Sequence, residues 1–554
     1  MKKFLLLLCL SLISILYAET TIQPGNVSGT WISENSPYLI EGEITVPDGE
    51  TLNIQPNVTV EFQGHYKFHV QGRLLAIGES ENEILFTIND TTGFGDINAQ
   101  QGAWQGIRFN NTPATNDSSR IEFCKINYSK ANGFDPPCSS SGGGIYVENF
   151  DKLYIFNTTI RYCKAMLGGG IALDTANIKM NSNLIFDNEG WSDGGGLYCI
   201  HSSPLIENTV FKGNYGSSGG GMACWYYSSP ILNNVGFTAN DATIHGGGLF
   251  CKYYSNPNLN EVTFKQNTAS YGAAMNFNEN SNPIIFKTSI IGNHSLTSSG
   301  AFSCGINSNP VIINSTIAGN SSVSGGVSYI YDSHPVFLNC ILWDNEPADF
   351  WFADWEQYTN SVTFAYCDLQ ETEDDFVNAE YADFNWLEGN ISEDPLLFAL
   401  DINKDYLQED SPCRDAGTAY FEWNAQILLD LDEDEYCGDA PEMGSYELLP
   451  VESENEDILF ANFELRNYPN PFNPSTTIFF QISRKDAKSA EIEIYNLKGQ
   501  KIKTFSNLQI NTTTDQQIFW DGTDQTNNPV SSGIYFYELK TDGLSKTKKM
   551  IMIK

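Results

Sequence analysis

Apolar and polar residues alternate in short runs between Gly194 and Asn345, and one pattern of these runs is written six times. The clearest copies begin with a glycine cluster, as in GGGLYCIHSSP at Gly194 and GGGMACWYYSSP at Gly219. The period is about 26 residues, which lies within the range of stacked repeat proteins. Within each copy the apolar side chains are spaced by two, which predicts β-strands rather than helices.

The six copies align on their proline residues, and this alignment places similar residues in columns. An aliphatic or aromatic residue stands two and again seven positions after each proline. Asparagine stands ten positions after every proline, in the column Asn214, Asn240, Asn267, Asn293, Asn320 and Asn345. A further inward-facing column is predicted at Cys199, Cys224, Cys251, Phe277, Cys304 and Tyr329.

Short strands separated by Gly, Ser, Asn and Pro argue against a helical solenoid and predict an all-β fold, a right-handed parallel β-helix. Each repeat would form one coil, and equivalent residues would stack about 4.8 Å apart on successive coils. Asparagine suits an inward position because its amide donates to one neighbour and accepts from the other. Coils from about residue 38 to residue 345 would number about twelve and form a rod about 55 Å long.

The first 18 residues have the features of a secretory signal peptide. Lys2 and Lys3 precede an apolar run, and Ala18 comes before a polar segment. The apolar run is too short to span a bilayer, so we expect an exported protein without membrane insertion.

The segment after the predicted signal peptide alternates with glycine turns from Thr21 to Thr87. It resembles the opening coils of many secreted bacterial β-helix proteins. A solenoid needs such a segment because its first coil would otherwise expose an apolar end and an unpaired strand edge. We therefore assign residues 19–345 to an N-terminal cap and the β-helix.

Most of the negative charge of the chain lies in one segment. The chain has a formal net charge of −38, and residues 346–457 contain 32 acidic residues against Lys404 and Arg414. Nucleic acid is therefore a poor partner for this part of the protein. Within it, the stretches SEDPLLFALDINKDYLQEDSPCRDAG and DAPEMGSYE resemble the closing segment of many bacterial β-helices. Residues 346–449 are therefore predicted to form the acidic terminal coils and cap.

The acidic segment also contains a candidate cation site and a candidate disulfide. Asp430, Asp432 and Asp434 alternate as in a calcium-binding loop, but the positions that follow do not fit an EF-hand. The alternatives are a calcium site of another geometry and a solvated acidic loop. Cys413 and Cys437 lie in irregular sequence and are the better candidates for a disulfide, whereas the column cysteines are predicted to fill the core.

The composition changes after a polar linker at residues 450–461. Residues 462–554 contain 12 Lys and Arg residues against 9 Asp and Glu residues, and about seven alternating strands predict a small Ig-like antiparallel β-sandwich. The stretches PNPFNPSTTI and VSSGIYFYEL resemble the type A sorting domain of type IX secretion. The resemblance implies handling by the type IX secretion machinery through the periplasm. The protein would then be secreted or attached to the outer cell surface.

Parallel β-helices host polysaccharide lyases and hydrolases, so an enzyme is one hypothesis. Pectate-type lyases resemble one another in using an arginine base, but no arginine occurs between Arg161 and Arg414. Glycosidic cleavage needs two facing carboxyl groups about 5 to 10 Å apart. The carboxylates of the repeat occur singly on different columns, so no catalytic residues are assigned.

Aromatic residues gather before the proline of two successive copies. Side chains there alternate inward and outward, so about half of the rings should be exposed and able to stack on sugars. The alternative is that these rings pack beneath a neighbouring loop. The candidate ligand-binding residues are Trp225, Tyr226, Tyr227, Tyr253, Tyr254 and His201.

These features lead to one main hypothesis and two alternatives. The main hypothesis is an exported β-helical protein that binds or adheres to an extracellular polysaccharide or surface glycan, with no cofactor except possible Ca²⁺. The alternatives are a polysaccharide lyase or hydrolase with a non-standard site, and a structural stalk without a ligand.

Overall fold

The computed structural model describes two parts of the chain, residues 19–447 and 463–552, apart from short internal segments. The predicted signal peptide and linker therefore lie outside the described residues. The chain divides into two compact units, Met1–Leu448 and Leu449–Lys554. The internal segments that are not described are 97–98, 133–139, 348–349, 354–358, 372–380, 398–405, 433–434, 469–473, 483–489, 497–499, 509–515, 527 and 542–543.

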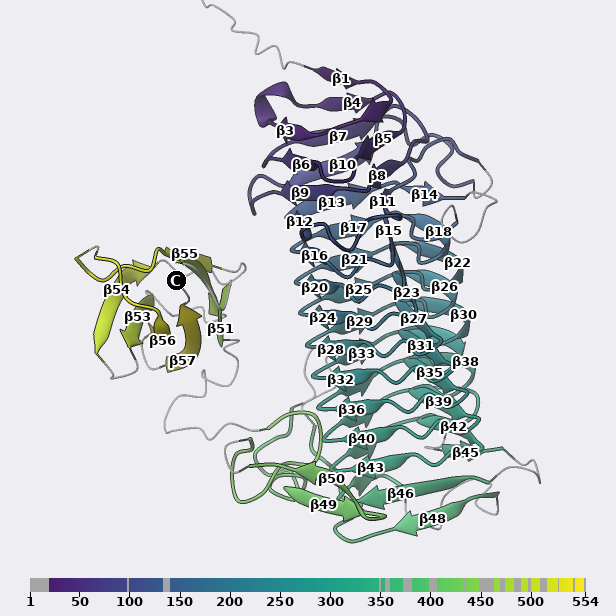
Figure 1. The fold of residues 1–554 in the computed structure, drawn as a ribbon. Coiled ribbons are helices and arrows are strands. Elements are labelled where there is room, and N and C mark those ends of the chain that lie inside the picture. The colour runs from purple at the N-terminus through teal and green to yellow at the C-terminus, as the bar shows by residue number, and fades with distance from the viewer. Residues whose placement is uncertain are drawn as a thin grey trace, which may run out of the picture. The chain divides into compact units, whose positions relative to one another are not determined.

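The first unit is a parallel β-solenoid of about 13 turns, as predicted (Figure 1). Three parallel sheets of 14, 13 and 14 strands run along it, and each strand pairs with the equivalent strand of the next coil. The solenoid begins at β1 (Thr20–Ile22) and ends at β48 (Asp383–Trp386), within the acidic segment.

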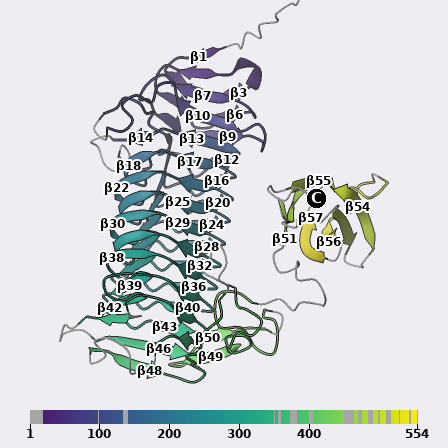
Figure 2. The same cartoon turned by 180° about the vertical axis from the view of Figure 1, so that it is seen from behind.

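Each coil in the middle of the solenoid contains four strands. In one coil these are β23 (Leu197–Ile200), β24 (Leu205–Glu207), β25 (Val210–Lys212) and β26 (Tyr215–Ser218). The last of these belongs to a fourth, seven-stranded sheet from β14 (Lys130–Ala131) to β38 (His294–Ser298) (Figure 2). The repeat pattern did not predict this sheet.

The inward-facing residues form one continuous core, and the predicted cysteine column is buried within it. Strand pairing joins Cys199, Cys224, Cys251, Phe277 and Cys304 in order, but the next member is Ile330. The prediction of Tyr329 in this column was wrong. The turn before Pro335 is one residue shorter than its neighbours, so alignment on prolines shifts this strand by one residue.

The asparagine column forms a buried hydrogen-bonded ladder, as predicted. The amide nitrogen of Asn267 donates to Asn293 Oδ1 at 2.9 Å and to the Phe237 carbonyl at 3.0 Å. Its side-chain oxygen accepts from both the backbone and the amide nitrogen of Asn240 at 3.0 Å. The ladder starts one coil earlier than predicted, at Asn188.

The glycine clusters form the corner between the seven-stranded and the 13-stranded sheets. Gly219 has φ of 66°, and a Cβ there would lie 2.3 Å from the Met222 carbonyl oxygen and 2.8 Å from the Ala223 side chain. The next two glycines are equally tight against the backbone of the following coil. Glycine is therefore needed because the corner folds back against the outer face of the 13-stranded sheet.

The acidic segment forms the last coils of the solenoid and a hairpin that packs against their outer side. An antiparallel hairpin, β49 (Tyr420–Trp423) and β50 (Gln426–Asp430), packs Phe421 and Leu429 against the outward side chains Ile313 and Leu338. The hairpin thus covers the side of the final coils.

The second unit contains two antiparallel sheets, as predicted for the sandwich. Both sheets contribute to one core, for example through Ile478 and Ile492. One sheet has the order β51-β52-β55 and the other β54-β53-β56-β57. The strands are β51 (Phe463–Tyr468), β52 (Thr476–Ile482), β53 (Ala490–Asn496), β54 (Lys501–Leu508), β55 (Gln516–Trp520), β56 (Gly533–Thr541) and β57 (Leu544–Met552).

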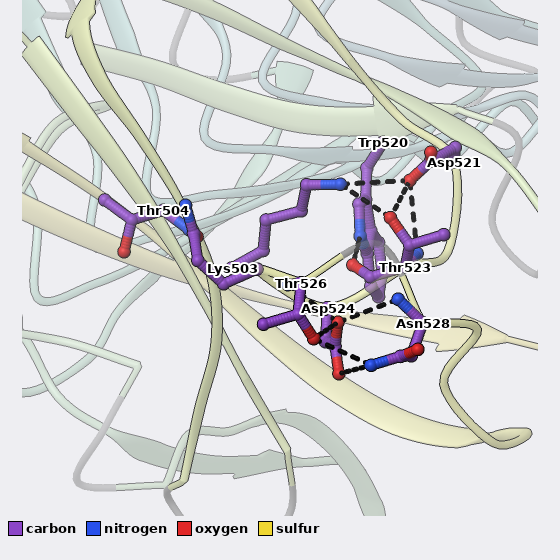
Figure 3. Close-up of polar contacts among 9 residues, drawn as sticks. Lys503, Thr504, Trp520, Asp521, Thr523, Asp524, Thr526 and Asn528 are labelled. Atoms are coloured by element: carbon purple, nitrogen blue, oxygen red, sulfur yellow. Dashed lines mark hydrogen bonds and ion pairs between the residues drawn. The ribbon is translucent and has the colours of Figure 1, made fainter.

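A polar loop after β55 is held by its own hydrogen bonds (Figure 3). Lys503 Nζ lies 3.2 Å from Asp521 Oδ1 and donates to Thr523 Oγ1 at 2.7 Å. Asp524 Oδ1 accepts from the backbone nitrogens of Thr526 and Asn528 at 2.9 Å. These carboxylates are occupied by protein donors, so the loop is a structural turn.

Candidate functional site

The structure brings the six aromatic candidates together in the turns between the 13-stranded sheet and the next sheet. We call these residues the aromatic platform: His201, Trp225, Tyr226, Tyr227, Tyr253 and Tyr254. The Tyr226 and Tyr253 rings stack at 4.6 Å with an interplanar angle of 11°, and the Tyr227 and Tyr254 rings stack at 5.3 Å and 7°. His201 stacks on Tyr226 at 5.9 Å.

Exposure differs across the aromatic platform. Tyr226, Tyr254 and His201 are exposed, and Tyr227 is the most exposed tyrosine at 63%. Trp225 and Tyr253 are half-buried. Tyr226 is sandwiched between His201 and Tyr253, whereas Tyr227 has ring contact with Tyr254 alone among the described residues. One face of Tyr227 therefore remains without an aromatic neighbour.

The turn that bears the aromatic platform is enlarged in four coils. In the coil of His201, one residue separates Ile200 from the serine that bonds the next coil, whereas two residues, Tyr226 and Tyr227, separate Trp225 from Ser228. The same two-residue spacing recurs after Lys252, Asn278 and Gly305 and is lost after Tyr331.

Both residues of each enlarged turn adopt left-handed backbone conformations. The φ angles are 49° and 59° at Tyr226 and Tyr227, and 57° and 61° at Tyr253 and Tyr254. A bulky residue in this region costs roughly 1–2 kcal/mol, which is why Gly, Asn and Asp are usual there. Bulky residues adopt this conformation in other turns of the solenoid as well, for example Phe123, Tyr128 and Tyr162, and the platform places four tyrosines there in two successive turns.

Beside the platform, outward side chains form three rows along the solenoid. The outer row lies on the outward face of the 13-stranded sheet and comprises Tyr146, Ala172, Tyr198, Ala223, Phe250, Asn276 and Ser303. The turn row lies at the ends of the same strands and comprises Ile200, Trp225, Lys252, Asn278, Gly305 and Tyr331. The rim row comes from the seven-stranded sheet and comprises Leu167, Asp193, Ser218, His245, Tyr271 and Ser298.

The three rows meet at Phe250. The Trp225 ring lies 5.7 Å from the Phe250 ring, and the His245 ring lies 5.6 Å from it on the rim side. Outer-row residues from Tyr146 to Phe250 form a buried apolar cluster. Trp225 therefore packs partly against this cluster and is partly available to solvent, so it is neither a core residue nor a free surface residue.

Lys252 is the cationic centre of the site. Its Nζ lies 4.8 Å from the Tyr253 ring centroid, 5.5 Å from that of Trp225, and 3.1 Å from Glu279 Oε1. Burial alone would lower the pKa of Lys252, but the hydrogen bond and charge of Glu279 outweigh it and raise the pKa. Lys252 therefore stays protonated and fixes the orientation of two platform rings.

Two titratable groups of the rim row have shifted pKa values. Burial lowers the pKa of His245 to about 4, and the charge of Lys252 adds to the effect. Burial raises the pKa of Asp193 against the opposing hydrogen bonds from Ser192 and Ser218. His245 is consequently neutral at pH 7. Burial of charge at Asp193 has a cost in stability.

Four polar atoms of the rows are buried and have no hydrogen-bond partner among the described residues. They are two ring nitrogens, Trp225 Nε1 and His245 Nδ1, and two amide oxygens, Asn276 Oδ1 and Asn278 Oδ1. Buried polar groups are usually bonded, so four exceptions in neighbouring coils indicate groups that a ligand could satisfy.

Sequence reasoning missed the outer and rim rows. His245, Asp193 and Ser218 each stand directly before a glycine cluster, and this column was the signal that could have found them. The contact of His245 with Phe250 depends on the unpredicted fourth sheet.

The other candidate residues do not assemble into a site. Asp430 is exposed at the end of β50, the Asp432 backbone nitrogen donates to Glu435 at 2.9 Å, and Asp434 lies outside the described residues. No cluster of three or more His, Cys, Asp or Glu side chains that could hold a metal occurs in the described part of the chain.

The expected disulfide is not formed in this structure. Cys413 and Cys437 are free thiols, and Cys413 is buried with its Sγ 3.0 Å from Asp368 Oδ2. The cap folds Cys413 against the last coils, so its thiol faces the carboxyl group of Asp368.

Within the described residues, the structure contains no helix with the length and apolar character needed to cross a membrane.

Comparisons with known proteins identify one region of the chain, near its C-terminus. No curated protein matches the chain. A solved structure, that of dimeric latent PorU from Porphyromonas gingivalis, is 22% identical over 17% of this chain and 10% of that chain, with a TM-score of 0.16. Residues 466–554 match the secretion system C-terminal sorting domain. The chain therefore carries a type IX sorting domain C-terminal to a β-solenoid. This domain implies that the protein is exported and is then either secreted or attached to the cell surface.

Proposed function

We propose that the exported solenoid binds an extracellular polysaccharide or surface glycan at the aromatic platform. The observation that carries this proposal is the set of four tyrosines in left-handed turn positions, stacked in pairs, with three of the four exposed. The neighbouring enlarged turns hold Glu279 and Asn280, and Ile306 and Asn307, at the same left-handed positions, so the turn does not require tyrosine. Binding of a ligand would account for the four tyrosines.

The chemistry of the platform suits a sugar. Tyr227 offers a ring face on which an apolar sugar face can stack, and the tyrosines offer phenol hydroxyl groups beside it. Lys252 and Glu279 provide a paired donor and acceptor in the same turns. Aromatic residues that combine an apolar body with a polar tip are enriched at binding sites for this reason.

The test is retention of glycans by a Tyr227→Ala variant. Tyr227 is mostly exposed, so its replacement should leave the melting temperature nearly unchanged, whereas loss of an aromatic anchor should weaken binding by about 2 kcal/mol or more. Tyr420→Ala is the matched control, because Tyr420 is an exposed tyrosine on β49 outside the platform. If Tyr227→Ala and Tyr420→Ala bind glycans equally well, the binding site lies outside the aromatic platform. Failure of the unaltered protein to retain any glycan would favour a structural stalk.

Cleavage of a polysaccharide is the second candidate function. It is favoured by Asp193, a half-buried rim-row carboxyl whose raised pKa suits a proton donor. A panel of polysaccharides incubated with the protein and with Asp193→Asn would test it. Turnover that is lost in the variant would replace binding by catalysis as the function.

We further infer that the sorting domain delivers the solenoid as a separable unit. Ending the chain near Leu459 should leave the solenoid folded but retained inside the envelope, and fractionation of cells with an antibody to the solenoid would measure this. Normal secretion of the truncated protein would contradict the inference.

A further inference from the structure

We infer that the ligand of this site is an uncharged, hydroxyl-rich polysaccharide rather than a uronic acid or sulfated polymer, and that His245, Asn276 and Asn278 determine this specificity. The inference rests on the proposed function and extends it to a ligand class. It comes from the charges and the unsatisfied polar atoms of the three rows beside the platform.

The charges of the site disfavour an anionic polymer. From Ala172 to Ser303 the three rows contain one lysine or arginine, Lys252, and Glu279 already neutralises it at 3.1 Å. Asp193 adds a carboxylate on the rim, while His245 is neutral above a pKa of about 4. A polymer with regular negative charges would meet no free cation here and would be repelled by Asp193.

The polar atoms of the site match hydroxyl groups. Trp225 Nε1 is a donor, the Asn276 and Asn278 oxygens are acceptors, and His245 Nδ1 is either, depending on its tautomer. A hydroxyl group both donates and accepts, so it can satisfy each of these atoms. Asn276 is 3% exposed and stands between Phe250 and Ser303 on the outward face, where a polar side chain without a partner is costly.

Two side chains lie against two of these residues, Trp225 and Asn278, and would move when the ligand binds. The Lys252 ammonium lies over the Trp225 ring, and the Tyr331 ring lies across Gly305, where a Cβ would be 2.0 Å from it. The Tyr331 hydroxyl bonds the Asn278 amide at 2.7 Å. Both contacts involve the ends of side chains, so rotation of these side chains can expose Trp225 and Asn278 without moving the backbone.

The experiment measures retention of the full-length protein on immobilised neutral polymers, a β-glucan and a xylan, and on anionic polymers, polygalacturonate and alginate, across a range of salt concentrations. We expect neutral polymers to bind at least tenfold more tightly and with little dependence on salt. Asn278→Ala and His245→Phe should each weaken neutral binding about tenfold, as expected for lost hydrogen bonds in a desolvated site. Asn258→Ala, on the exposed face of β32 (Asn258–Asn260), is the control.

The outcomes separate this inference from the proposed function. Tighter, salt-sensitive binding of the anionic polymers, or neutral binding that is unaffected by both variants, would overturn the inference and leave glycan binding intact. Glu279→Lys makes the local charge positive. If the inference holds, this substitution should increase retention of the anionic polymers, and unchanged retention would contradict the role given to the local charge. Absence of binding to every polymer would overturn both.

Discussion

Two turns of the same coil follow different rules. The asparagine turn has one length in every coil of the ladder, and its side-chain amides are bonded from Asn188 to Asn345. The turn that bears the aromatic platform changes length, holds bulky residues in left-handed conformations, and borders polar atoms without partners. The asparagine turn is suited to the stacking of coils. The turn that bears the aromatic platform has features that stacking does not require, as expected of a binding site.

The comparison predicts that damage to the asparagine turn has the largest effect on stability. Asn267→Leu should remove four hydrogen bonds and strand the Phe237 carbonyl and the Asn240 backbone nitrogen. At about 1–3 kcal/mol for each unsatisfied buried group, the solenoid should lose about 3 kcal/mol or more. Chemical denaturation followed by tryptophan fluorescence would measure the loss.

Asn345→Leu is the control for position in the ladder, because Asn345 has no asparagine beyond it and loses one hydrogen bond fewer. Its cost should be smaller. Equal losses for the two variants would argue against a cooperative ladder.

Acid should destabilise the site side of the coil through His245. The folded protein keeps His245 neutral down to a pKa of about 4, whereas the unfolded chain binds a proton below about 6.5. The contribution is therefore fully present above pH 6.5 and is lost as the pH falls towards 4, by about 2–3 kcal/mol.

His245→Phe retains a ring against Phe250 and Tyr271 and removes this titration. The difference in unfolding free energy between the variant and the unaltered protein should accordingly change between pH 6.5 and pH 4. Tyr271→Phe is the control, since it keeps the ring contact with His245 and should leave the pH profile unchanged. A pH-independent difference for His245→Phe would contradict the assignment of a neutral histidine.

The ion pair of the site should contribute little to stability. Glu279→Gln removes the partner of Lys252, and both side chains are partly exposed, so we expect a loss of at most about 1 kcal/mol. The loss should diminish at high salt because ions screen the pair. A double-mutant cycle with Lys252→Met would measure the coupling, and a salt-independent coupling well above this value would indicate a desolvated pair.

The smallest effect on stability is expected at a platform tyrosine. Tyr226→Asn exchanges ring stacking on His201 and Tyr253 for a residue that tolerates φ of 49°. The loss of ring stacking destabilises the protein and the relief of the left-handed backbone cost stabilises it, so the unfolding free energy should change by less than about 1 kcal/mol. Glycan retention should nevertheless fall. A large loss of stability would show that the platform serves packing, in contrast to the conclusion drawn from the two turns.

Much of the solenoid could be predicted because its determinants are local. The spacing of Leu197 and Cys199 by two fixed which side chains face inward, and the 26-residue period fixed which of them stack. The same reasoning placed Asn267 inside the ladder and Tyr226 beside Tyr253. Motifs near the C-terminus were sufficient to identify the sorting domain. Each of these conclusions needs knowledge of one coil and of its repetition.

Tertiary structure alone decided how unequal coils align and which surfaces come together. Pairing of β39 (Phe302–Gly305) with β42 (Ser328–Tyr331) put Ile330 rather than Tyr329 in the core, because hydrogen bonds between strands set the register and a shorter turn absorbs the difference. The corner that begins at Gly246 likewise places the His245 ring against the Phe250 ring. Cys413 met Asp368 through a contact that spans 45 residues. Local alternation determines the face on which a side chain lies, whereas its neighbours on that face depend on the path of the chain through the corners.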